Sequence, residues 1–95
     1  MSRYSIEENA VILKALSTND ERLIGKYYYG LKREFEKNIA RGFNIIPTRY
    51  FEDIYHDAFS ELWEQSIQGK LTDATLTVPV GAYLQGIGVN MAHPI

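Results

Sequence analysis

The sequence of 95 residues contains no cysteine. This absence excludes a disulfide framework, a thiolate zinc site and a cysteine nucleophile. Glycine and proline are also scarce, with seven and three residues, which excludes collagen-like and other low-complexity chains. The remaining composition, 45% hydrophobic and 23% charged, is typical of one folded domain and not of a disordered chain.

Long hydrophobic runs are missing as well. The longest weakly charged stretch, residues 75–91, is interrupted by a proline, three glycines, a glutamine and an asparagine. A membrane-spanning helix needs about 20 mostly apolar residues. Residues 1–8 lack the apolar core of a signal peptide. We therefore expect a cytoplasmic protein without a membrane partner, and a net charge of −2 gives no sign of nucleic-acid binding on its own.

Hydrophobic periodicity predicts four helices, at about residues 6–16, 19–41, 50–68 and 80–92. The expected fold class is therefore all-α, a compact bundle of about four helices. Ser5 and Glu8 form a capping-box pattern before the first helix, and Asn19 or Thr18 is expected to cap the second. The apolar faces expected to form the core are Ile6, Ala10, Leu13 and Leu16; Leu23, Ile24, Tyr27, Tyr28, Leu31, Phe35 and Ile39; Ile54, Tyr55, Ala58, Phe59, Leu62 and Trp63; and Val80, Tyr83, Leu84, Ile87 and Met91.

The segments between these helices are expected to be irregular. Gly42 is expected to end the second helix, and residues 44–49 with Pro47 are expected to form a short loop. Residues 75–78 alternate like a strand, but no second strand exists to pair with them, so a loop over 69–79 is favoured. Three glycines, at positions 81, 86 and 88, are expected to weaken the fourth helix, each by about 1 kcal/mol relative to alanine if fully helical.

The residues offer little for catalysis. His56 lies among acids, but a helical face that mixes acids with one histidine is usually only solvated. The second histidine, His93, lies near the end of the sequence. No nucleophile–base pair and no phosphate-binding glycine loop is recognisable. We therefore expect neither an enzyme nor a metal site nor a cofactor.

The third predicted helix combines an apolar stripe with five carboxylates, on Glu52, Asp53, Asp57, Glu61 and Glu64. One interpretation is an ordinary solvated helix surface. The other is a docking face for a basic partner, because clustered acids repel each other and arginine or lysine from a partner would relieve that repulsion.

Two segments carry a resemblance to a known family. Residues 50–64 read YFEDIYHDAFSELWE. They resemble region 2.2 of the sigma-70 family of RNA polymerase sigma factors, whose pattern is Asp, two apolar residues, Gln, an acid, an apolar residue and Phe, with Leu-Trp three and four positions on. Residues 80–90 read VGAYLQGIGVN and resemble region 2.3, with its aromatic-Leu-x-x-Ile-x-x-Asn pattern. Residues 13–29 are similar to the family's opening helices. The resemblance covers nearly the whole chain and is closest to the extracytoplasmic-function (ECF) type.

The resemblance implies a sigma region 2-like bundle that acts in transcription initiation. The third helix would dock on the clamp helices of the largest subunit of the RNA polymerase core, through Asp53, His56, Asp57 and Glu61, with His56 at a position where the family has Gln. The domain would also help to recognise and melt the promoter −10 element and capture an unstacked base. The matching DNA-binding residues are Lys70, Thr72, Tyr83 and Asn90. An anti-sigma factor is a further partner that the family implies.

The sequence also departs from the family pattern. No lysine or arginine follows Lys70, although basic residues normally continue the fourth helix and hold DNA phosphates. The region 4 helix-turn-helix domain is absent, and the glycines loosen the fourth helix. We therefore expect an excised or truncated N-terminal domain that docks on polymerase better than it binds promoter DNA. The alternative hypothesis is a non-transcriptional helical adaptor that binds another basic protein through its acidic docking face.

Overall fold

The computed structural model describes residues 4–42 and 48–92. In these ranges it contains four α-helices, α1 (Asn9–Ser17), α2 (Glu21–Gly42), α3 (Phe51–Ile67) and α4 (Val80–Ala92), and two short 3-10 helices, η1 (Ile6–Glu8) and η2 (Thr48–Tyr50). Neither range contains a strand, so the predicted all-α bundle and the predicted loop over residues 69–79 are confirmed. The turn expected after Gly42 and most of the loop expected at 44–49, with Pro47, lie outside the described residues.

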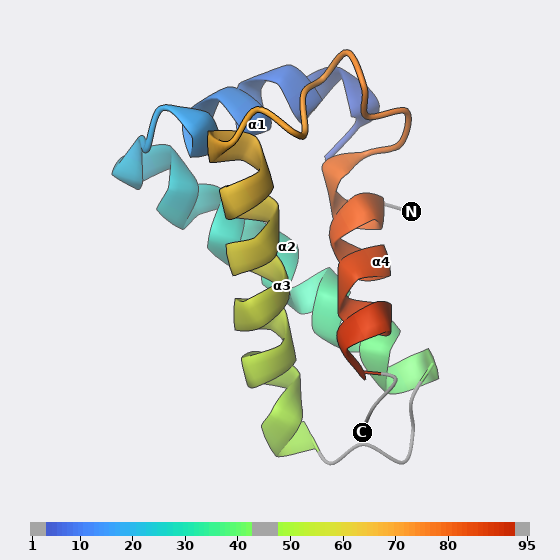
Figure 1. Cartoon of the computed structure of the whole chain (residues 1–95). Coiled ribbons are helices and arrows are strands. Elements are labelled where there is room, and N and C mark those ends of the chain that lie inside the picture. The colour runs from blue at the N-terminus through green and yellow to red at the C-terminus, as the bar shows by residue number, and fades with distance from the viewer. Residues whose placement is uncertain (1–3, 43–47, 93–95) are drawn as a thin grey trace.

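Helix α3 is the central element of the bundle, because it packs against α1, α2 and α4 (Figure 1). Helix α4 lies alongside α3 and also packs on α2. Helix α1 crosses one end of the bundle, where the loop that joins α3 to α4 passes beside it (Figure 1). Three sides of α3 are thus occupied by the other helices, and its fourth side remains open to solvent.

The core gathers apolar side chains from all four helices and from the loop before α4. The predicted faces of α2 and α3 are buried, with Leu23, Tyr28 and Trp63 at their edges. In α4, Val80 and Leu84 are fully buried, while Tyr83, Ile87 and Met91 pack against the core from its edge. The buried hydrophobic residues are Ile12, Leu13, Ala15, Leu16, Ile24, Tyr27, Leu31, Phe35, Ile39, Phe51, Ile54, Tyr55, Ala58, Phe59, Leu62, Leu71, Leu76, Val80 and Leu84.

The predicted core face of the first helix is wrong at two of its four positions. Ile6 is 43% exposed and Ala10 is exposed, whereas Ile12 and Ala15 are buried beside Leu13 and Leu16. The reason is local geometry, because Ile6–Glu8 form a 3-10 turn with about three residues per turn. Counting 3.6 residues per turn from Ile6 therefore assigns the wrong residues to the core-facing side.

Two capping predictions have opposite outcomes. The Ser5–Glu8 box is present, since the Ser5 amide donates to the Glu8 carboxylate at 3.3 Å. The predicted cap of the second helix, Asn19 or Thr18, is wrong. Asp20 takes that role, because its Oδ1 accepts from the Leu23 amide at 3.3 Å. Asn19 instead adopts a left-handed conformation, with φ of 56°, at the turn that ends α1.

The start of α4 is held by a side chain 71 residues away along the chain. Asn9 is only 1% exposed. Its Nδ2 donates to the Val78 carbonyl at 2.8 Å, and its Oδ1 accepts from the Val80 amide at 2.9 Å. One amide group therefore satisfies a donor at the N-terminus of α4 that has no partner within the helix. This contact joins the first and last helices of the bundle.

Gly88 allows α4 to lie close to α2. A Cβ built on Gly88 would lie 2.2 Å from Cζ of Phe35, far inside contact distance. A Cβ on Gly86 would meet nothing within 4 Å. The glycines of α4 were all expected to weaken the helix, but Gly88 is also required by its packing.

Candidate docking surface

The side of α3 that faces away from the other helices carries a row of exposed polar residues. This row, called the acidic surface below, consists of Glu52, Asp53, His56, Asp57, Ser60 and Glu64. It forms because the helix turns Ile54, Tyr55, Ala58, Phe59 and Leu62 into the core, which leaves the intervening positions on the outside.

Only one described cation is within ion-pair distance of this surface. Nζ of Lys32, on α2, lies 3.7 Å from Oε1 of Glu52 and 3.4 Å from Oε1 of Glu36. The carboxylate of Glu36 is the main cause that raises the pKa of Lys32. The acids further along the surface, Asp53, Asp57 and Glu64, have no ion pair with any described residue. They therefore repel one another without compensation from the chain's own described cations.

Three of the four residues expected to bind polymerase lie together on this surface. Asp53, His56 and Asp57 are all exposed. Asp53 and Asp57 also border a hollow of about 450 Å³ that reaches Met91 of α4. Glu61 is placed differently: it is half-buried on the α4 side, and its Oε1 accepts from Nε2 of Gln65 at 2.9 Å. Glu61 is thus already engaged within the molecule.

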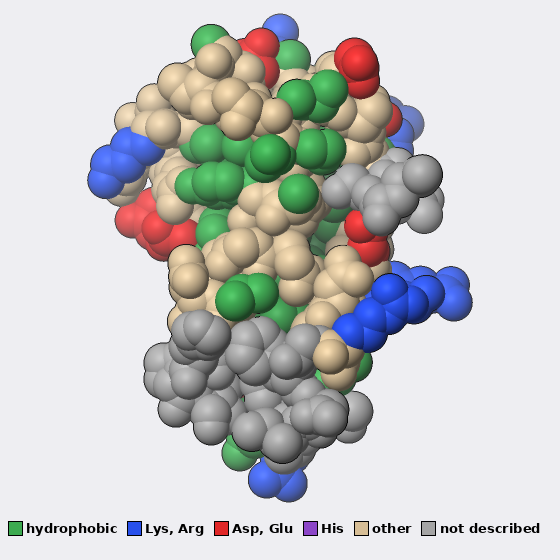
Figure 2. Space-filling view, turned by 90° about the vertical axis from the view of Figure 1, so that its right-hand side faces the viewer, with side chains coloured by type: hydrophobic (Ala, Val, Ile, Leu, Met, Phe, Trp, Pro, Cys, Tyr) green, Lys and Arg blue, Asp and Glu red, His purple; other side chains and the backbone are tan. Residues whose placement is uncertain are grey.

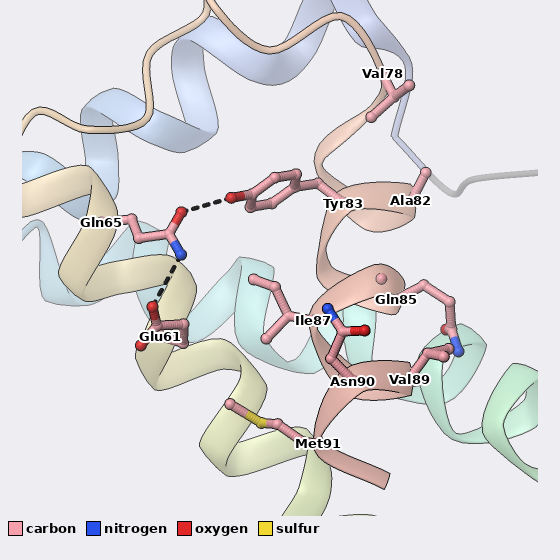
Figure 3. Close-up of a pocket in the computed structure, with 11 residues that line it drawn as sticks. Glu61, Gln65, Val78, Ala82, Tyr83, Gln85, Ile87, Val89, Asn90 and Met91 are labelled. Atoms are coloured by element: carbon pink, nitrogen blue, oxygen red, sulfur yellow. Dashed lines mark hydrogen bonds between the residues drawn. The ribbon is translucent and has the colours of Figure 1, made fainter. Parts of the chain in front are cut away.

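The residues expected to bind DNA fall into two groups. Tyr83 and Asn90 border a hollow of about 860 Å³ beside α4, together with Glu61, Gln65, Val78, Ala82, Gln85, Gly86, Ile87, Val89 and Met91 (Figure 3). The Tyr83 hydroxyl donates a hydrogen bond to Oε1 of Gln65 at 2.6 Å. This bond holds the Tyr83 ring between α3 and α4. Asn90 is exposed, and its side chain makes no hydrogen bond to any other described residue, so its amide is open to solvent.

Lys70 and Thr72, in the loop after α3, do not border that hollow. Thr72 lines a separate hollow against α1, and Lys70 is exposed. The Thr72 amide donates to Oγ1 of Thr75 at 3.1 Å, and the amides of Thr75 and Leu76 donate back to the Thr72 carbonyl. With Leu71 and Leu76 buried, this segment is pinned to the bundle. The structure therefore does not bring the four predicted DNA-binding residues into one site.

The face formed by α4 is uncharged along the whole helix, whose sequence VGAYLQGIGVNMA has no acidic or basic residue. Figure 2 views this side of the molecule: hydrophobic side chains gather in its middle, and charged side chains lie toward its edges. The acidic surface and the α4 face thus differ sharply in electrostatic character, although α3 and α4 pack against each other.

One feature beside the acidic surface was missed by the sequence interpretation. A hollow of about 310 Å³, called the aromatic hollow below, lies between α2 and α3. It is lined by Glu21, Ile24, Gly25, Tyr28, Tyr29, His56, Phe59, Ser60 and Trp63. The available signal was Tyr29, which lies off the apolar stripe of α2 and is 74% exposed.

Two further findings concern the described ranges. Residues 4–42 and 48–92 contain no group of three or more His, Cys, Asp or Glu side chains that could hold a metal ion. No helix in the same part of the chain has both the length and the apolar character needed to cross a membrane.

Comparison with known proteins returned no matching family model, no matching curated protein and no matching solved structure.

Proposed function

We propose that this chain is a transcription initiation factor domain of the sigma region 2 type, which docks on the clamp helices of RNA polymerase through the acidic surface. The observation that carries this proposal is the exposure of Asp53, His56 and Asp57 on one side of α3, whose other sides are buried against three helices. These residues belong to the segment, 50–64, that resembles sigma region 2.2.

Electrostatics supports a basic partner for this surface. Uncompensated acids on one helix face raise the local negative potential, which attracts arginine and lysine and steers their approach. Exposed pairs are screened by salt over a Debye length of about 8 Å at physiological ionic strength. Docking through this surface should therefore weaken as salt is added.

In this proposal promoter DNA would contact the face beside α4, which adjoins the acidic surface at Met91. Asn90 offers an exposed donor and acceptor, and Tyr83, Lys70 and Thr72 complete the residues that the resemblance assigns to the −10 element. Because no cation follows Lys70, the phosphate contacts that supply most of such affinity are few. We expect weak DNA binding by this chain alone, a cytoplasmic location, and an anti-sigma factor that competes for the acidic surface.

A non-transcriptional adaptor is the second candidate, and the α4 face favours it. A helix without any cation is a poor surface for a polyanion. In that case the acidic surface would bind a different basic protein, and the α4 face would have no role with nucleic acid.

Calorimetric titration with the cognate RNA polymerase core tests the first candidate. The exchanges Asp53→Asn and Asp57→Asn should each weaken binding by up to about fivefold, since an exposed ion pair contributes up to about 1 kcal/mol. A matched control removes two carboxylates elsewhere, with Glu7→Gln and Asp73→Asn, both of which are exposed and outside α3. The control should bind like the wild type.

The outcomes separate the two candidates. Undiminished affinity of the Asp53→Asn, Asp57→Asn double variant would contradict docking through the acidic surface. If the wild type does not bind polymerase core but its acidic surface binds another basic protein, the adaptor is the correct function.

A further inference from the structure

The aromatic hollow has walls made largely of ring systems. Tyr28 contacts Tyr29 and Phe59 edge-to-face, with ring centroids 5.4 Å and 5.0 Å apart and interplanar angles of 89° and 81°. Phe59 contacts Trp63 in the same way, at 6.5 Å and 75°. Because neighbouring rings are nearly perpendicular, the edge of one ring points at the face of the next. The wall of the hollow therefore presents both ring faces and ring edges.

These rings are held in place by the bundle. The Trp63 Nε1–H donates to the Leu16 carbonyl at 3.1 Å, which anchors the indole from α1. Phe59 is buried in the core. The carbonyl of Tyr28 accepts a hydrogen bond from the Tyr55 hydroxyl, which fixes the backbone of α2 at this point. The Phe59 and Trp63 part of the hollow is therefore preorganised, whereas Tyr29 is 74% exposed at its rim.

The one charged side chain among the described residues that line the hollow is acidic, although Lys32 of α2 lies near enough to Tyr28 to act on it electrostatically. Glu21 of α2 lines the hollow, and no lysine or arginine does. His56 and Ser60 belong both to its lining and to the acidic surface, so the two features are continuous along α3. Aromatic faces next to carboxylates attract cations, through the ring quadrupole and through Coulomb attraction.

The wall on the α2 side has a gap where Gly25 stands. A Cβ built on Gly25 would meet no atom within 4 Å, so the space in front of this residue is open. Glycine is unfavourable inside a helix by about 1 kcal/mol relative to alanine. The packing of the bundle does not require glycine at position 25, and a larger side chain there would extend into the hollow that Gly25 lines.

We propose that the aromatic hollow is a binding site for an arginine side chain of a basic partner protein. The guanidinium would stack on the face of one of the rings of Tyr28, Tyr29 and Trp63, which lie at steep angles to their neighbours, and Glu21 would balance its charge. Arginine fits better than lysine because its planar, weakly hydrated head stacks on aromatic rings. The identity of the partner as RNA polymerase rests on the proposed function, whereas the chemistry of the hollow does not.

A titration with a small probe tests the hollow directly. The probe is Nα-acetyl-arginine amide, and the control ligand is Nα-acetyl-citrulline amide, which has nearly the same shape but no charge. Trp63 is the chain's single tryptophan and lines the hollow, so tryptophan fluorescence reports on the surroundings of this one side chain. We expect the arginine probe to change this fluorescence at concentrations about two- to fivefold lower than the citrulline probe does.

Two leucine exchanges provide matched variants. Gly25→Leu fills the hollow, whereas Gly86→Leu adds the same side chain at an open position on α4. The first should lose the response to the arginine probe, and the second should keep it. Circular dichroism melting of both variants checks folding. The exposed variant Tyr29→Ala should weaken the response and offers a second test if Gly25→Leu does not fold.

Binding of the same variants to polymerase core distinguishes this inference from the proposed function. If core binds the wild type and loses affinity for Gly25→Leu, both are supported. If core binds both chains equally, polymerase does not place an arginine in the hollow, while docking through the acidic surface stands and the probe titration decides the hollow. If core binds neither, the proposed function fails, and the probe titration still decides the hollow. Equal responses to the arginine and citrulline probes overturn the inference in every case.

Discussion

Exchange of Gly88 for alanine should destabilise the protein, although alanine is the better helix former. The gain from helix propensity is about 1 kcal/mol. Against it, the new Cβ would lie 2.2 Å from Cζ and 2.4 Å from Cε2 of Phe35. Phe35 is 3% exposed and its ring lies 5.0 Å from that of Tyr55, so it has little room to move aside.

The sign of the effect follows from comparing the two terms. Overpacking a core typically costs about 1–3 kcal/mol, and a contact this short belongs at the upper end of that range. We therefore expect a net loss of about 1–2 kcal/mol in the free energy of unfolding. For a domain of this size, each 1 kcal/mol corresponds to roughly 4–8 °C in Tm.

The matched control is Gly86→Ala, two residues away in the same helix. Its Cβ meets nothing within 4 Å, so only the propensity term remains and the variant should be stabilised by about 1 kcal/mol. Urea unfolding followed by far-ultraviolet circular dichroism measures both. A Gly88→Ala chain as stable as Gly86→Ala would refute close packing of α4 on α2. Pairing Gly88→Ala with Phe35→Leu should recover part of the loss, since the smaller side chain makes room.

Two other predictions concern stability. Asn9→Ala should lower the free energy of unfolding by about 1–3 kcal/mol, because it leaves the buried Val80 amide without a hydrogen-bond partner. The control exchange Asn90→Ala, at an exposed position, should change the free energy of unfolding by less than about 0.5 kcal/mol. Equal effects of the two exchanges in urea titrations would contradict the cap on α4. Burial raises the pKa of the Tyr55 hydroxyl above the unfolded value of about 10, so its contribution to stability is complete below that pH and is lost as pH rises further. The wild type should therefore lose more stability between pH 9 and pH 11 than Tyr55→Phe does, and parallel declines in urea unfolding would show that Tyr55 is not responsible.

The acidic surface and the aromatic hollow together suggest how affinity and specificity are divided. Exposed carboxylates such as Asp53 and Asp57 act over distance and favour any basic partner. The aromatic hollow instead discriminates among cations, because a planar guanidinium group stacks on aromatic rings more favourably than an ammonium group does. Variants of the two features should accordingly differ in their salt dependence: the carboxylate exchanges reduce it, whereas Gly25→Leu lowers affinity at every salt concentration.

Much of the fold was already determined by the sequence. The apolar periodicity of α2 and α3 predicted their buried faces, because the 3.6-residue repeat places such residues on one side of any helix of that length. The same repeat predicted that Asp53, His56 and Asp57 share the opposite side. Where the local geometry was not α-helical, as at Ile6, the period failed.

Only the tertiary structure decided which groups from different helices meet. The pairing of Asn9 with Val80, the close approach of Gly88 to Phe35, and the hollow between α2 and α3 all join residues distant in sequence. Periodicity describes one helix at a time and carries no information on interhelical distance or crossing angle. These are set by how side chains of unequal size fill the shared core, so such contacts appear only when the whole bundle is assembled.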